Sequence, residues 1–282
     1  MKITQIGNIT DGQDGAVFGG LLFRFKTNGL CYVYDLKNLT IEKKSPIVSI
    51  FTLDKSDIIA PHSNSVVFGN QYYNEDDEFP LLYTNIYNNY AKSEDKLTGV
   101  CCVYRIWRED NEFKNQLVGL IKIGFTEDDI WSTGDDVRPF GNFVLDNEKG
   151  LYHAFTMRDK DQTTRYFSFK LPDISNGVID EKFGVPSVVL TKDDIIDTFD
   201  TEYHRFIQGA CYENGNIYSL EGFSGDAVNP PAMRIISVKD KKQTECIYFS
   251  DFGLTIEPEF IYFENEVCYY GDNHGNLYTI EF

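Results

Sequence analysis

The sequence lacks the short motifs that identify a reaction. Its 282 residues contain no H-E-x-x-H helix motif, no C-x-x-C pair, no EF-hand loop, no G-x-S-x-G turn and no phosphate-binding loop. The Gly-rich stretch 11–20 is not followed by a predicted helix, so it is only weak evidence for a nucleotide-binding loop. The sequence therefore predicts a fold more readily than a reaction.

The chain also lacks a pattern typical of disulfides, secretion or membrane insertion. Cys101 and Cys102 are adjacent, so on a strand they point to opposite faces and do not bridge easily. No run approaches the roughly 18 apolar residues of a membrane span, and the first residues lack the apolar core of a signal peptide. Buried free thiols explain the six cysteines better than a disulfide frame does. We therefore expect a cytoplasmic protein.

Positive charge is scarce, with 26 Lys and Arg against 44 Asp and Glu, and the formal net charge is -18. Such an acidic surface repels phosphate backbones and anionic headgroups, so we expect neither a nucleic-acid nor a membrane partner. Solubility alone is one explanation of this charge. An attraction for cations or cationic ligands is the other. The sequence does not indicate an oligomeric state.

Aromatic residues are abundant, at 15% of the chain, and many fall in a β-prone phrase that recurs five times. Each copy follows another apolar strand across a turn or loop, and Asn/Gly pairs supply the positive φ values of tight turns. Recurrence of this kind is typical of a repeat architecture. The copies are 32–36, 102–106, 167–171, 234–238 and 278–282.

Each copy belongs to a unit of up to four strands. The predicted innermost strands are Ala16–Gly20, Ser65–Gly69, Asn142–Asp146, Phe206–Tyr212 and Glu259–Phe263. The predicted fourth strands are Pro46–Leu53, Leu117–Ile123, Val188–Leu190 and Cys246–Ser250. After the third of these, Thr191–Phe199 begins with a Thr cap and acidic residues, which favours a short helix.

The fifth unit ends at Phe282 without a fourth strand, while Lys2–Ile9 is predicted as a strand without a unit of its own. Pairing the two completes a four-stranded sheet and closes a ring. Four-stranded sheets arranged radially make a β-propeller, which leaves only short, protected edges. We predict an all-β, five-bladed β-propeller forming a single domain over 1–282, closed by its N-terminal strand. The alternative is a β-sandwich with coincidental spacing.

In a propeller the loops that lead into the innermost strands form a funnel, which is the default place for a ligand. Asp11 and Asp14 lie among glycines, so a role in turn formation is an alternative to ligand binding. For His204 and its charged neighbours, an ordinary ion-pair network is an alternative to a binding site. The candidate site residues in these loops are Asp11, Asp14, His62, Asn64, Arg138, Asn142, Glu202, His204, Arg205, Glu257 and Glu259.

The arrangement resembles five-bladed β-propellers such as the arabinanase-type glycosidases and the calcium-dependent nucleotidases. The resemblance covers the whole chain but depends on blade organisation alone, which many functions share. By position it implies that Asp14 is a catalytic base and Glu202 a catalytic acid. The third carboxylate of the glycosidases has no equivalent, because Arg138 and Asn142 stand in the third loop.

These observations leave three functional hypotheses. The first is binding of a small molecule or glycan in the central funnel without chemistry. The second is a glycoside hydrolase in which Asp14 and Glu202 flank the bond and Tyr203 and Phe140 stack on sugar rings. The third is a cation such as calcium held on the axis; otherwise no cofactor is expected. The incomplete carboxylate set favours binding over hydrolysis.

Overall fold

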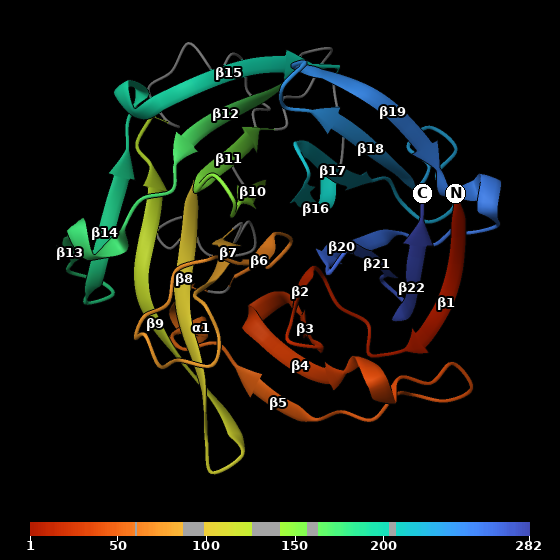
Figure 1. The fold of residues 1–282 in the computed structure, drawn as a ribbon, viewed down its shortest axis with the longest axis horizontal. Helices are drawn as coiled ribbons and strands as arrows, with labels where there is room; N and C mark the ends of the chain where they lie inside the picture. Colours follow the sequence, from red (N-terminus) through yellow and green to blue (C-terminus); the bar gives the residue numbers. More distant parts are fainter. Residues whose placement is uncertain (60, 87–98, 126–141, 157–162, 203–206) are drawn as a thin grey trace.

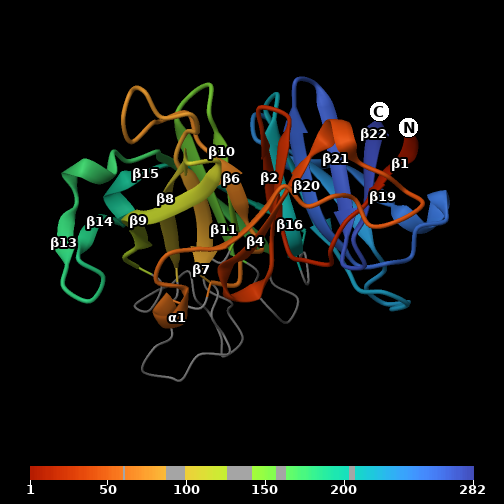
Figure 2. The same ribbon diagram turned by 90° about the horizontal axis from the view of Figure 1, so that it is seen from below.

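Five β-sheets surround a central axis in the computed structural model, which describes residues 1–59, 61–86, 99–125, 142–156, 163–202 and 207–282. Figure 1 shows the ring face-on and Figure 2 shows it from the side. Within each sheet the first three strands run outward from the axis in sequence order. The chain is therefore a five-bladed β-propeller, as the recurring phrase predicts.

The first, third and fourth blades are four-stranded and antiparallel. The first contains β2 (Gly15–Phe18), β3 (Leu21–Phe25), β4 (Leu30–Asp35) and β5 (Ser49–Thr52). The third contains β10 (Asn142–Asp146), β11 (Leu151–Thr156), β12 (Thr164–Lys170) and β15 (Ile195–Thr201). The fourth contains β16 (Ile207–Glu213), β17 (Asn216–Glu221), β18 (Ala232–Ser237) and β19 (Lys242–Tyr248).

The second blade is a six-stranded sheet, and the fifth uses both ends of the chain. The second contains β6 (Val66–Phe68), β7 (Leu82–Ile86), β8 (Val100–Glu109), β9 (Glu112–Ile123), β14 (Val185–Leu190) and β13 (Val178–Asp180). The fifth contains β20 (Pro258–Glu264), β21 (Val267–Asp272), β22 (Asn276–Glu281) and β1 (Lys2–Asn8). Helical structure among the described residues is short: α1 (Ser56–Ile59) and 3-10 turns at Thr27–Gly29, Leu36–Asn38, Ile174–Asn176, Lys192–Asp194 and Phe249–Phe252.

The predicted fourth strand of the third blade, Val188–Leu190, is wrong. This segment belongs to β14, which pairs in parallel with β9 and so extends the second blade. A run of β-branched residues pairs with whichever sheet edge it can reach, and local sequence does not specify which one. The outermost strand of the third blade is β15, which pairs with β12.

The predicted helix Thr191–Phe199 is also wrong beyond its first turn. Thr191 does form a capping box with Asp194, but the helical turn covers only Lys192–Asp194. β15 then begins at Ile195. The β-branched and aromatic residues that follow the cap suit a pleated strand, and pairing with β12 outweighs the local helical signal. A capping signal alone therefore does not predict the length of a helix.

Strand β1 closes the ring by pairing antiparallel with β22, with Lys2 opposite Glu281 and Asn8 opposite Asn276. The two chain ends lie side by side in Figure 1. Just beyond β1, the backbone N–H of Ile9 donates to Gly275 O at 2.7 Å. Both predicted partners, the N-terminal strand and the last blade, therefore meet as the sequence predicts.

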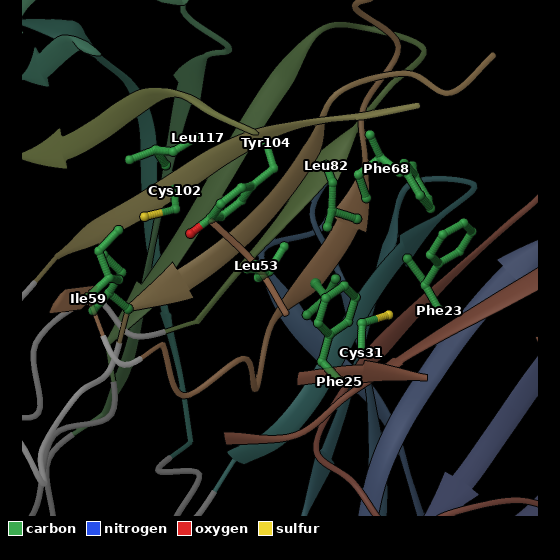
Figure 3. Close-up of a cluster of buried hydrophobic side chains, with 14 of the residues drawn as sticks. Phe23, Phe25, Cys31, Leu53, Ile59, Phe68, Leu82, Cys102, Tyr104 and Leu117 are labelled. Atoms are coloured by element: carbon green, nitrogen blue, oxygen red, sulfur yellow. The ribbon is translucent and has the colours of Figure 1, made fainter. Parts of the chain in front are cut away.

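Hydrophobic clusters between blades hold the ring together. Between the first two blades, the Phe23 ring meets Phe68 edge-on at 5.2 Å between ring centroids, and both side chains are buried. Phe25, Leu82 and Tyr104 extend the same cluster, as Figure 3 shows. Aromatic rings suit this position because edge-on pairs add stabilisation beyond the apolar area that they bury.

Five of the cysteines, Cys31, Cys101, Cys102, Cys211 and Cys268, pack into the hydrophobic clusters. All six are free, and five of them are buried. In the part of the chain that the structure describes, no helix is long and apolar enough to cross a membrane.

Ile9 tests the closure. It is 1% exposed and packs with Val17, Leu22 and Leu277, between the last blade and the first. Replacing Ile9 with Ala should lower the free energy of unfolding by about 2–5 kcal/mol, because a buried cavity is left at the junction. Ile50→Ala, at a 54% exposed position on β5, should cost about 0.5 kcal/mol or less. Urea unfolding of both variants measures the difference; equal losses would contradict the closure.

Candidate functional site

The innermost strands β2, β6, β10, β16 and β20 surround the axis and divide the candidate site between two faces. We call the face on which these strands begin the N-terminal face and the opposite one the C-terminal face. The predicted site residues that precede or begin the innermost strands, such as Asp14, Asn142 and Glu259, lie on the N-terminal face. Arg138, His204 and Arg205, with the aromatic residues Phe140 and Tyr203, lie outside the described residues.

Asp14 lies at the centre of the N-terminal face and is fully buried. Its Oδ2 accepts a hydrogen bond from the backbone N–H of Val66 on β6 at 2.9 Å. Its Oδ1 has no hydrogen-bond partner and lies near Gly209 of β16, where an added Cβ would be 3.5 Å away. Burial raises the pKa of the Asp14 carboxyl well above its usual value, and the N–H groups of Gly15 and Val66 oppose this. Asp14 therefore touches several blades at once.

Arg24 and Glu259 complete a buried charged cluster with Asp14. The Arg24 guanidinium is 0% exposed, donates to Gly12 O at 2.8 Å, and interacts electrostatically with Glu259 and Asp14. Burial raises the pKa of Glu259 well above its usual value, while Arg24 acts to lower it. One buried cation thus lies near two carboxyl groups, and its positive charge favours their ionised forms.

Polar side chains at the start of the innermost strands join one blade to the next. These contacts link the first blade to the second, the second to the third, the fourth to the fifth, and the fifth to the first. They are Asp14 Oδ2 with Val66 N (2.9 Å), Ser65 Oγ with Asn142 Oδ1 (3.4 Å), Gln208 Nε2 with Glu257 Oε1 (2.5 Å) and Gln13 Nε2 with Glu259 Oε1 (3.4 Å). Four of the predicted site residues therefore hold blades together at the axis.

Asp11, Asn64 and His62 take no part in these contacts between blades. Asp11 is exposed and pairs with Lys26 Nζ at 2.9 Å. Asn64 is buried, and its backbone N–H donates to Asn85 Oδ1 at 3.1 Å within the second blade. His62 is half-buried in the turn before it.

Glu202 lies at the periphery of the ring, outside the funnel. It is exposed and follows β15, an outermost strand. There it lines a surface groove with Thr201, Lys242 and Gln243, between the outer strands of the third and fourth blades. The structure therefore places Asp14 and Glu202 in different parts of the molecule, one at the axis and one at the rim.

A cavity of about 330 Å³ opens along the axis towards the C-terminal face. Four of the five innermost strands contribute to its walls, so it lies at the centre of the ring. Asp14 interacts electrostatically with two of its wall residues, Cys211 and Tyr262. The lining residues are Val67, Val144, Leu145, Asp146, Asn147, Glu148, Ala210, Cys211, Tyr212, Glu213, Asn214, Tyr262 and Phe263.

The sequence analysis missed both Arg24 and this cavity. Arg24 lies within the apolar strand Leu21–Phe25. A charged residue is rarely buried in such a strand unless it is paired, so its position could have indicated a buried ion pair. The cavity-lining Glu148 and Asn214 fall in turn sequences, which local rules explain without a ligand.

An axial cation such as calcium was the third hypothesis from the sequence. Among the residues that the structure describes, no group of three or more His, Cys, Asp or Glu side chains is placed to hold a metal ion. The buried carboxyl groups of Asp14 and Glu259 share their surroundings with Arg24 instead. We therefore assign no step to a metal.

Comparisons with known proteins support the fold and no more. No family model matches the chain, and no curated protein matches it by sequence. Among solved structures, Myxococcus xanthus glutaminyl cyclase is similar with a TM-score of 0.51 and 9% identity, over 100% of this chain and 94% of that chain. A chain of the mitotic checkpoint complex gives a TM-score of 0.39 with 8% identity, over 96% of this chain and 60% of its own. Saccharomyces cerevisiae Sqt1 gives a TM-score of 0.37 with 6% identity, over 93% of this chain and 55% of that chain.

Arg24→Met tests the buried charged cluster. At neutral pH we expect the free energy of unfolding to fall by about 3 kcal/mol or more, because Asp14 and Glu259 lose the buried cation that favours their charged forms. Both carboxyls have a folded-state pKa above the unfolded value, so the folded state takes up their protons first as pH falls. The loss in free energy of unfolding caused by Arg24→Met should therefore become smaller between about pH 7 and pH 5.

The control for this variant is Arg108→Met, which removes a 41% exposed guanidinium that pairs with Glu78. Its cost should stay near or below about 1 kcal/mol at both pH values. Urea titrations at the two pH values measure all of these differences. If Arg24→Met lowers the free energy of unfolding no more than Arg108→Met does, or if its loss grows on acidification, Arg24 does not stabilise the charged forms of Asp14 and Glu259.

Proposed function

We propose that this protein binds a small molecule in its central channel, in the cavity that opens on the C-terminal face. The observation that carries the proposal is that walls from four different blades enclose one space of about 330 Å³. That volume lies at the lower end of the range of small-molecule sites. The convergence of several blades on one concave, axial space is the arrangement in which propeller folds hold ligands.

The walls of the cavity combine apolar area with a few polar groups. Val67, Ala210 and Phe263 offer apolar contact, while Asp146 and Tyr212 offer polar atoms. Such a mixture is typical of sites in which apolar area supplies affinity and a few polar groups fix orientation. Aromatic rings beside carboxylates also suit a sugar ring, so a monosaccharide belongs to the ligand class that we propose.

Glycoside hydrolysis by Asp14 and Glu202 has less support. An acid and a base must flank one glycosidic bond, within about 10 Å of each other. Asp14 is fully buried, and its Oδ2 accepts from a backbone N–H, while Glu202 is exposed beside outer strands. Neither carboxyl group lines the axial cavity. Binding is therefore the function that the geometry supports better.

The free cysteines support a cytoplasmic location as part of the same proposal. All six thiols are unbridged, which suits a reducing compartment. The net charge of -18 argues against anionic partners such as nucleic acid or acidic membranes.

A thermal-shift screen of small metabolites tests the proposal. A compound that binds the native state should raise the melting temperature by several degrees, since about 2.7 kcal/mol is gained at 100 times the Kd. Val67→Phe places a larger side chain at a half-buried wall position and should abolish the shift. Val178→Phe, at an 80% exposed position on β13, should leave the shift intact. A screen without stabilising compounds, or shifts that Val67→Phe leaves unchanged, would count against the cavity.

A further inference from the structure

The charges around the axial cavity indicate the chemical class of its ligand. Three carboxylates, those of Asp146, Glu148 and Glu213, line the space. Among the described lining residues there is no Lys, Arg or His. Building on the proposed function, we infer that the cavity binds an organic cation, a small molecule with an ammonium or guanidinium group.

Asp146 is the innermost of the three carboxylates. It ends β10 and is 1% exposed. Its Oδ1 accepts from the backbone N–H of Lys149 at 2.9 Å, and its Oδ2 lies 3.6 Å from Lys149 Nζ. The carboxylate also interacts with the hydroxyl of the wall residue Tyr212, whose pKa it helps to raise. The Lys149 side chain is 64% exposed, so solvent screens its ammonium and it offsets the negative charge of Asp146 only weakly.

Glu213 and Glu148 form the mouth of the cavity. Glu213 ends β16 and is half-buried, with Oε1 accepting from Asn214 Nδ2 at 3.0 Å. Glu148 is exposed in the turn after β10. Burial raises the pKa of the Glu213 carboxyl, and the negative charges of Glu266 and Glu148 raise it further. These like charges repel one another, and a bound cation would relieve the repulsion.

The groups packed behind the walls do not reverse the negative charge. The ammonium of Lys149 lies beside Asp146, while the negative charge of Asp14 acts on the wall residues Cys211 and Tyr262 from the side of the N-terminal face. His153 lies behind the wall, where its ring stacks on Tyr212 at 5.5 Å between centroids. Burial lowers the pKa of His153 to about 4, so it is neutral near pH 7.

Aromatic rings add a second attraction of the same sign. Tyr212, Tyr262 and Phe263 all line the cavity. The face of an aromatic ring carries negative electrostatic potential and attracts ammonium and guanidinium groups, more strongly where water is excluded. Carboxylates at the mouth and rings in the wall therefore both favour a cation over a neutral or anionic molecule of the same shape.

Two series of matched compounds test the sign of the ligand charge. Tyramine, tyrosol and 4-hydroxyphenylacetate share one ring and differ mainly in an end group that is positive, neutral or negative. The second series consists of 1,4-diaminobutane, 1,4-butanediol and succinate. They share a linear four-carbon chain and have end groups that are positive, neutral and negative. Isothermal titration at low ionic strength should detect binding of a cation from at least one series, while the neutral and anionic compounds bind at least about tenfold more weakly. Added salt should weaken cation binding.

Charge-removing variants show whether the cation binds in the cavity rather than to the acidic surface at large. Glu213→Gln and Glu148→Gln should each lower cation affinity, by about tenfold for Glu213. Glu181→Gln, which removes an exposed carboxylate on the hairpin between β13 and β14, should leave affinity unchanged. Glu148 lies in an exposed turn, so its variant keeps the test valid should Glu213→Gln fail to fold.

The outcomes separate the inference from the proposed function on which it rests. Neutral or anionic compounds that bind at the cavity and are blocked by Val67→Phe would overturn the cation class while leaving the binding site standing. Cation affinity that is the same in Glu213→Gln, Glu148→Gln and Glu181→Gln would also overturn it. If neither these series nor the metabolite screen contains a compound that binds, both proposals fail together.

Discussion

The pairing of β1 with β22 is the constraint on which the rest of the structure depends. It joins residues from opposite ends of the chain, such as Ile3 and Ile280, and supplies the fourth strand of the last blade. From this outer position the chain passes through Ile9 directly to the innermost strand β2. The closing strand therefore fixes where Asp14 enters the axis, and a free N-terminal strand would leave both the last blade and the axial cluster incomplete.

The axis that this closure creates has two unlike ends. On the N-terminal face, buried polar side chains such as Asp14, Asn142 and Glu259 bridge neighbouring blades, and Arg24 supplies a positive charge. On the C-terminal face the innermost strands end around a cavity. Burying polar groups is costly unless they are paired, so a densely bonded end suits a structural role. The cavity at the other end is where a ligand has room.

The architecture could be predicted from the sequence because a propeller repeats one local pattern. Alternating strands, Asn/Gly turns and a missing fourth strand were sufficient to predict five blades and their closure. Pairing between segments that are distant in sequence was harder to predict. Val188–Leu190 has the composition of a strand, but only the three-dimensional structure shows that it pairs in parallel with β9. The strand Ile195–Thr201 was hidden by a helical cap before it.

The candidate site was predicted less completely than the fold. Placing polar loop residues at the axis located Asp14 and Glu259, because the start of an innermost strand has to lie there. Glu202 follows an outermost strand, and its position at the rim depends on β15, which the sequence did not predict. Arg24 and the cavity mouth at Glu213 require knowledge of which strand ends converge, and one sequence does not contain that information.

Cross-linking the two chain ends tests the closed ring most directly. Thr4 and Thr279 lie opposite each other on β1 and β22, so Thr4→Cys with Thr279→Cys places two sulfurs on directly opposed positions. We expect a disulfide to form in high yield on mild oxidation, detected by mass spectrometry of the joined peptides. Thr4→Cys with Thr198→Cys, on β15 of the third blade, should not cross-link. Equal yields for the two pairs, or none for the first, would contradict the closure.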